Sequence, residues 1–143
     1  MLKVVLILAL AAMGTNAMAE WVGIGRANDG SGKLYANPKT IVQSGQKVTF
    51  LALTDFKQTQ DVKVGIKPFN SYVLRLEVDC KQYKSNNSAV IAYSKNTGKG
   101  EITFSATYEA QWKPIIRGSI LELAAKYACS KSRLKIKMTT PSK

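Results

Sequence analysis

The alternation of apolar and polar residues predicts strands over much of this chain. In residues 71–80 one face carries Tyr72, Leu74, Leu76, Val78 and Cys80, while the other carries Val73, Arg75, Glu77 and Asp79. A period of two is the spacing of a β-strand, so Cys80 is expected to point at the core. Residues 47–56 are partly apolar on both faces, which is typical of a strand covered on both sides.

Shorter runs with strand-like spacing surround these two. They are residues 20–27, 33–35, 89–93 and 101–106, and most are separated by turn signals such as Asn28-Asp29-Gly30-Ser31-Gly32 and Asn96-Thr97-Gly98. Residues 57–67 have the polarity of a loop, although the alternating Val62, Val64 and Ile66 could extend an edge. Because every return is short, we expect about six strands in a mostly antiparallel sheet.

One helix is predicted near the C-terminus. Ser119 followed by Glu122 has the spacing of a capping box, in which each side chain satisfies a backbone donor. An amphipathic stripe follows, formed by Ile120, Leu123, Ala124, Tyr127 and Ala128. A short helix is not stable alone in water, so it must pack on one face of the sheet. The predicted fold class is therefore α+β.

The N-terminus has the features of a secretory signal peptide. Lys3 gives a positive start, residues 4–12 are apolar, and Ala17-Met18-Ala19 provides a cleavage site. The apolar run is far shorter than the roughly 20 residues that span a bilayer. We therefore predict that residues 1–19 are removed, that the mature chain has no transmembrane segment, and that it is exported. Its destination is the periplasm, the cell surface or the medium.

The chain has two cysteines, Cys80 and Cys129, and no histidine. Two cysteines in an exported chain indicate one disulfide, which would attach the end of the helix to the sheet. A free thiol or a metal site is the minor alternative, because two thiols alone do not complete a zinc site. We predict no metal and no cofactor.

Charge adds a preference for anionic partners. The net charge is +12, and loss of Lys3 with the signal segment leaves +11. Residues 130–143 carry five Lys or Arg and no acid, so we treat them as a basic tail after a domain at 20–129. The tail alternates at 133–138 and could form an edge strand, but we favour a mobile arm. A well-solvated surface with no polyanionic partner explains the charge equally well.

Catalytic patterns are scarce. Without histidine there is no Ser-His-Asp or Cys-His constellation. Asp55, Glu77 and Asp79 lie on predicted strands, but the neighbouring Arg75 and lysines favour ion pairing over acid–base chemistry. We therefore predict that the protein is not an enzyme.

Trp112 is the aromatic residue that best suits partner binding, because it lies in a predicted loop beside Lys113 and Pro114 instead of on a patterned face. The other candidate partner-binding residues are basic and close to the C-terminus: Lys131, Arg133, Lys135 and Lys137.

Several segments, in this order, resemble the surface-adhesin protein E-like domain family of Gram-negative bacteria. They are Trp21-Val22-Gly23-Ile24-Gly25, Asn37-Pro38-Lys39-Thr40-Ile41, Leu53-Thr54-Asp55-Phe56-Lys57, Glu77-Val78-Asp79-Cys80-Lys81, Gly98-Lys99-Gly100-Glu101, Trp112-Lys113-Pro114-Ile115 and Gly118-Ser119-Ile120 running to Cys129. The resemblance covers nearly all of residues 21–129. It implies an antiparallel sheet with one disulfide-linked C-terminal helix, surface exposure, the capacity to form a homodimer, and binding of host extracellular-matrix or plasma proteins.

Two functional hypotheses follow. The first is an exported, non-enzymatic, adhesin-like protein of the cell envelope that binds host proteins, anionic glycans or an envelope surface. The second is a periplasmic structural or assembly accessory that pairs with a partner at an exposed sheet edge. Nucleic acid is not expected as a partner.

Overall fold

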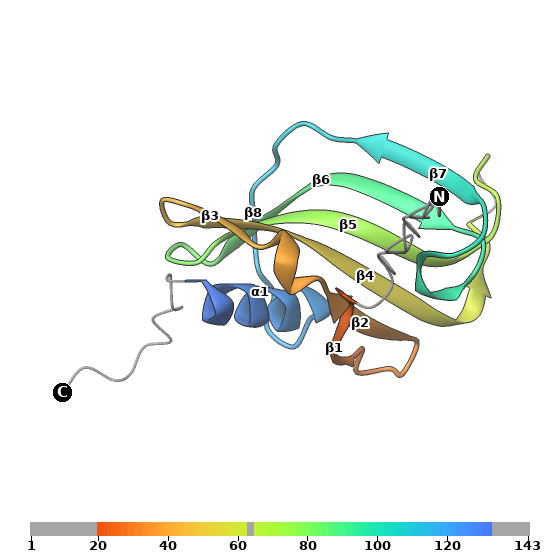
Figure 1. The fold of residues 1–143 in the computed structure, drawn as a ribbon, viewed down its shortest axis with the longest axis horizontal. Helices are drawn as coiled ribbons and strands as arrows, with labels where there is room; N and C mark the ends of the chain where they lie inside the picture. Colours follow the sequence, from red (N-terminus) through yellow and green to blue (C-terminus); the bar gives the residue numbers. More distant parts are fainter. Residues whose placement is uncertain (1–19, 63–64, 133–143) are drawn as a thin grey trace, which may run out of the picture.

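A computed structural model describes residues 20–62 and 65–132, which form one sheet and one α-helix (Figure 1). The strands are β1 (Val22–Arg26), β2 (Gly32–Ala36), β3 (Val42–Ser44), β4 (Lys47–Gln60), β5 (Phe69–Asp79), β6 (Lys84–Tyr93), β7 (Ile102–Thr107) and β8 (Lys113–Pro114). The helix is α1 (Ile120–Lys131), and the two short 3-10 turns are η2 (Pro38–Thr40) and η3 (Asn96–Gly98). The signal segment and residues 133–143 of the basic tail predicted at 130–143 lie outside the described residues, whereas Ser130 and Lys131 of that tail belong to α1.

The main path of the sheet has six strands in the order β1-β2-β4-β5-β6-β7. All neighbouring pairs are antiparallel, and the short strands β3 and β8 add to β4 and β6 outside this path. Since consecutive strands are joined by short connections, antiparallel pairing is the arrangement such connections permit. The predicted fold class is confirmed.

Helix α1 packs on one face of this sheet, against β1, β2, β4 and β5 (Figure 1). Strands β4 and β5 present Val48, Phe50, Leu76 and Val78 to it, all at most 2% exposed. The helix meets them with the small side chains of Ala124, Ala125, Ala128 and Cys129. Small residues allow the helix to lie close to the strands, so the core is narrow and densely filled at this point.

A disulfide fixes the end of α1 to the end of β5. Cys80 and Cys129 are bonded, with their Cα atoms 6.0 Å apart and a sequence separation of 49. Both are buried in the core cluster. The alternation that placed Cys80 on the apolar face of its strand therefore predicted its environment correctly.

The opposite face of the sheet is partly covered by the β6–β7 hairpin. Leu53 points away from α1 and is nevertheless fully buried, because Gly98 of η3 lies against its side chain. Ser71 holds this hairpin in place: its hydroxyl donates to the Lys95 carbonyl at 2.6 Å and accepts from Gly98 N–H at 2.9 Å. The prediction that the strand at 47–56 is covered on both sides at its middle is thus confirmed.

The predicted loop at 57–67 was wrong at its start, because β4 continues to Gln60, which pairs with Phe69 of β5. The extra residues include Lys57, Gln58 and Thr59, which are exposed. A hairpin that projects beyond the packed part of a sheet needs no apolar alternation, so the sequence pattern gave no signal for it. The short strands β3 and β8 were missed for the same reason.

Replacing Cys129 by Ser should destabilise the protein by about 4 kcal/mol, since a cross-link of this span restricts the unfolded chain by that amount in the chain-entropy treatment. Urea unfolding under oxidising conditions measures the change. Wild-type protein treated with reductant should unfold like the variant, and reductant should leave the variant unchanged. Equal midpoints for oxidised wild type and Cys129→Ser would contradict the prediction.

Candidate functional site

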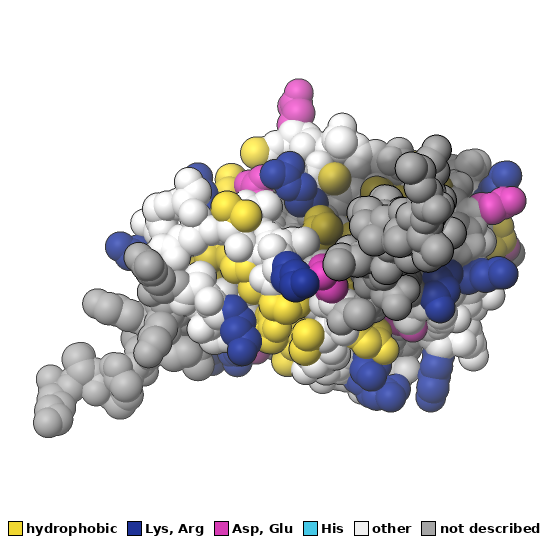
Figure 2. All heavy atoms as spheres, viewed as in Figure 1, with side chains coloured by type: hydrophobic (Ala, Val, Ile, Leu, Met, Phe, Trp, Pro, Cys, Tyr) yellow, Lys and Arg dark blue, Asp and Glu magenta, His cyan; other side chains and the backbone are white. Residues whose placement is uncertain are grey.

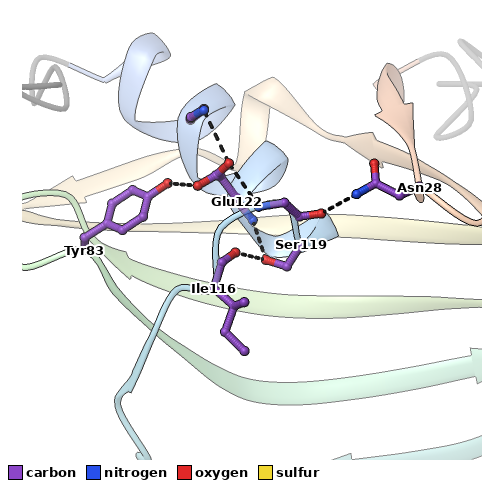
Figure 3. A network of polar contacts seen from close by, with 7 residues as sticks. Asn28, Tyr83, Ile116, Ser119 and Glu122 are labelled. Atoms are coloured by element: carbon purple, nitrogen blue, oxygen red, sulfur yellow. Dashed lines mark hydrogen bonds and ion pairs between the residues drawn. The ribbon is translucent and has the colours of Figure 1, made fainter.

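The start of α1 is held by a network centred on Glu122 (Figure 3). The Ser119 hydroxyl accepts from Glu122 N–H at 3.3 Å, which is the predicted half of the capping box. The return bond differs from the prediction, because Glu122 Oε1 accepts from Gly118 N–H at 3.4 Å. Ser119 N–H instead donates to the Ile116 carbonyl at 3.2 Å, so it does not need the glutamate.

Two distant turns also reach this network. The Tyr83 hydroxyl, from the turn between β5 and β6, donates to Glu122 Oε2 at 2.9 Å. Asn28, from the turn between β1 and β2, donates from Nδ2 to the Gly118 carbonyl at 3.0 Å. The first turn of α1 is therefore tied to both halves of the sheet (Figure 3).

The contact between Tyr83 and Glu122 changes the pKa of both groups in opposite directions. Burial, aided by the hydrogen bond to the carboxylate, raises the pKa of Tyr83 to about 12. The hydrogen bond from Tyr83, followed by the one from Gly118 N–H, lowers the pKa of Glu122. The pair is therefore most stable with a neutral phenol and an ionised carboxylate.

The strand carboxylates serve as hydrogen-bond acceptors, and the prediction that they form ion pairs was wrong. Asp55 Oδ1 accepts from Asn96 Nδ2 and from Thr97 N–H, each at 2.8 Å. Asp79 accepts from Gln46 Nε2 at 2.6 Å and from the N–H groups of the two residues that follow Cys80. Burial by itself raises the pKa of Asp79, but these hydrogen bonds outweigh it and hold the pKa below its usual value. Both carboxylates shape turns.

The described residues form two ion pairs, Lys39–Glu20 at 2.6 Å and Lys126–Glu122 at 3.4 Å. The other Lys and Arg side chains of the described ranges have no carboxylate within 4 Å. In the view of Figure 2, they are spread over the surface, with hydrophobic side chains exposed between them. The fold therefore presents a distributed basic surface.

The predicted partner-binding residues do not converge on one place. Trp112 is half-buried and lies under the Lys47 ammonium, 5.0 Å from the ring centroid. Lys113 is exposed on β8 and lines a hollow of about 450 Å³ beside the start of α1. Lys131 lies at the end of α1, 5.7 Å from the Tyr127 ring. Arg133, Lys135 and Lys137 are outside the described residues, so the role of the set stays a prediction.

A second hollow, of about 390 Å³, was missed by sequence reasoning. It is lined by Arg26, Lys33 and Lys57, which come from three segments of the chain. The signal was present in the turn at 28–32: a hairpin there places Arg26 beside Lys33. No residue pattern indicated that Lys57 would join them, because that depends on the pairing of β2 with β4.

Residues 20–62 and 65–132 contain no group of three or more His, Cys, Asp or Glu side chains that could hold a metal ion. Within the same ranges, no helix has the length and apolarity required to cross a membrane.

The family described as surface-adhesin protein E matches residues 21–130. The chain belongs to the surface-adhesin protein E family. A comparison with curated proteins gives no match. The family resemblance noted in the sequence is therefore confirmed, and membership supports an adhesin-like surface protein.

Solved structures of the family's Haemophilus influenzae protein E share the fold. The selenomethionine form has a TM-score of 0.59 at 15% identity, covering 78% of this chain and 87% of that one. Protein E from non-typeable Haemophilus influenzae has a TM-score of 0.56 at 14% identity, covering 81% of this chain and 79% of that one. At such identities the likeness shows the architecture alone.

Replacing Glu122 by Gln should lower the free energy of unfolding at pH 7. It should also remove the part of the stability that wild type loses at acidic pH. The lowered pKa means that the stabilisation from this carboxylate is present above its ordinary pKa of 4.5 and is lost as the pH falls through the lowered value. The difference in unfolding midpoint between wild type and Glu122→Gln should therefore shrink below about pH 4.5. Glu109→Gln, at an exposed position, is the control. A difference in unfolding midpoint between wild type and Glu122→Gln that stays constant down to pH 2.5 would refute the stabilising role of the Glu122 carboxylate.

Tyr83→Phe tests the other partner at alkaline pH. Because the pKa of Tyr83 is raised to about 12, the native state holds this proton more tightly than the unfolded state. Its contribution is complete below about pH 10 and is lost as the pH rises toward 12. Absorbance titration of the tyrosinates should lose its most alkaline step in the variant. Tyr108→Phe is the control, and an unchanged last step in Tyr83→Phe would rule out the pairing.

Proposed function

We propose that this protein is an exported, non-enzymatic binding protein that attaches to host extracellular-matrix or plasma proteins or to anionic glycans. Membership of the surface-adhesin protein E family supports the adhesin-like role. The observation that carries the proposal is the excess of cationic over anionic groups that are available on the surface. The carboxylates of Asp55 and Asp79 accept hydrogen bonds from neutral donors and do not pair with lysines. The cationic side chains around them have no carboxylate within ion-pair distance and are available to an anionic surface.

The arrangement of the side chains gives binding a better basis than catalysis. Glu122 is held ionised by a tyrosine, a backbone N–H and a lysine. Asp79 is buried and committed to a turn. Acid–base chemistry needs a group whose pKa is moved toward neutrality, whereas the pKa of each of these carboxylates is moved away from it.

A second candidate function rests on β7. This strand ends the main path of the sheet, and its outer edge has no strand partner among the described residues. Ile102, at its start, is 60% exposed. An open edge can accept an extended segment of another protein. The alternative function is therefore a periplasmic accessory that pairs with a partner through β7. A homodimer is also part of the proposal, formed through the β7 edge or through the basic surface.

Purified mature protein should bind immobilised fibronectin, collagen or heparin, and binding should weaken as salt rises from 0.05 to about 0.5 M, because exposed charges are screened over that range. A chain ending at Ser132, which lacks the basic residues 133–143, should bind more weakly. Surface plasmon resonance gives both comparisons. Binding that survives high salt and ignores the truncation would refute a basic binding surface. If protease added to intact cells does not digest the protein, and if the protein co-purifies with one envelope partner, the periplasmic accessory is favoured instead.

A further inference from the structure

The hollow lined by Arg26, Lys33 and Lys57 lies on the sheet face turned away from α1. Lys33 and Tyr35 of β2 alternate with the buried Leu34, which contacts the core beneath α1. Asp55 of β4 and Asn96 of η3 complete the wall on the other side. The three cations therefore come from β1, β2 and β4, and the hollow between them is lined mainly by polar groups.

The register of the strands places like charges beside each other here. Arg26 is directly opposite Lys33 in the β1–β2 pair. Like charges at directly opposite positions destabilise an antiparallel pair. Lys33 is also opposite Asp55 in the β2–β4 pair, which is the position from which a carboxylate could neutralise it.

That neutralisation does not take place. The Lys33 ammonium lies 4.9 Å from the centroid of the Tyr35 ring, a cation–π contact that points it along its own strand. Asp55 is instead turned to η3, where Asn96 Nδ2 and Thr97 N–H donate to its Oδ1. The described residues show no ion pair for Arg26, Lys33 or Lys57. The fold thus leaves three cations around one hollow without a carboxylate partner.

We propose that this hollow binds a sulfate group of a sulfated glycan. The inference rests on the proposed binding function and assigns a site to it. The Arg26 guanidinium can direct two N–H groups to two oxygens of one sulfate. Lys33, positioned by the Tyr35 ring, and Lys57 supply charge from the neighbouring strands.

A glycan chain suits this site better than a small isolated anion. The hollow is open to solvent at the surface, so a sulfate bound there can belong to a chain that continues across the protein. Lys95 and Lys99 are exposed on the same hairpin as Asn96, which lines the hollow. They can meet the next sulfates along the chain. The Asp55 carboxylate, held by η3, repels anions from one side and so directs the sulfate toward the three cations.

The test compares two triple variants with the same change in net charge. The first, Arg26→Thr/Lys33→Thr/Lys57→Thr, removes the cations of the hollow. The matched control, Lys67→Thr/Lys81→Thr/Lys84→Thr, removes three lysines from outside it. Calorimetric titration uses a heparin octasaccharide. The hollow variant should bind at least tenfold more weakly than wild type, and its plot of log affinity against log salt should be less steep by roughly 2 to 3, one unit for each lost contact with the polyanion. The control should change less than threefold.

Thermal unfolding supplies a readout that does not depend on binding. Without glycan, the hollow variant and the control should both melt close to the wild-type temperature, so that weaker binding cannot be attributed to unfolding. The octasaccharide should raise the melting temperature of wild type and control, but not that of the hollow variant. A hollow variant that the octasaccharide stabilises as much as it stabilises wild type would overturn the assignment of the site.

Competition separates the sources of the anion. Desulfated heparin should not displace the octasaccharide, and neither inorganic phosphate nor phosphatidylglycerol vesicles at matched charge should displace it. Displacement by any of these overturns the assignment to a sulfated glycan. Equal losses in the two triple variants overturn the site, because only net charge would then matter. If matrix proteins still bind in that case, the proposed function stands without this site; if neither they nor heparin bind wild type, both fail.

Discussion

The bond between Cys80 and Cys129 is the constraint on which the rest of this structure depends. A twelve-residue helix cannot hold itself in water, and α1 meets the sheet with alanines, which bury little apolar area each. The disulfide joins the last turn of α1 to the end of β5 and so reduces the conformational entropy of the unfolded chain. A modest apolar contact is then enough to keep the helix on the sheet. The disulfide and Phe50 then belong to one buried core cluster beneath the helix.

The other end of α1 is held by polar contacts. Glu122 collects the Tyr83 hydroxyl and the Gly118 N–H, while the Gly118 carbonyl accepts from Asn28. Tyr83 adopts a positive φ of 56°, a backbone conformation that non-glycine residues rarely adopt. Its hydrogen bond to the helix gives a physical reason for that conformation to persist. With sulfur at one end and a charge-assisted network at the other, the helix is fixed in both position and direction.

The same use of carboxylates decides the character of the surface. Asp55 orders the η3 hairpin and Asp79 orders the turn after β5, so neither neutralises a lysine. A basic composition thereby becomes a basic surface with unpaired cations, and three of them meet where β1, β2 and β4 lie side by side. The fold and the proposed recognition are linked, because the carboxylates of Asp55 and Asp79, which could have neutralised nearby lysines, accept hydrogen bonds that build the turns.

The sequence alone determined the two long central strands, the helix with its Ser119 cap, and the partnership of the cysteines, because each depends on local periodicity or on a count of two. Its net charge of +12 also led to the proposal that the protein binds an anionic partner. Only the tertiary structure decided that Glu122 would be shared with Tyr83, that Asp55 would turn to η3, and that Lys57 would join Arg26 and Lys33. These contacts join residues 24 to 42 positions apart in the chain. They are set by strand order and register, which alternation within a single strand does not encode.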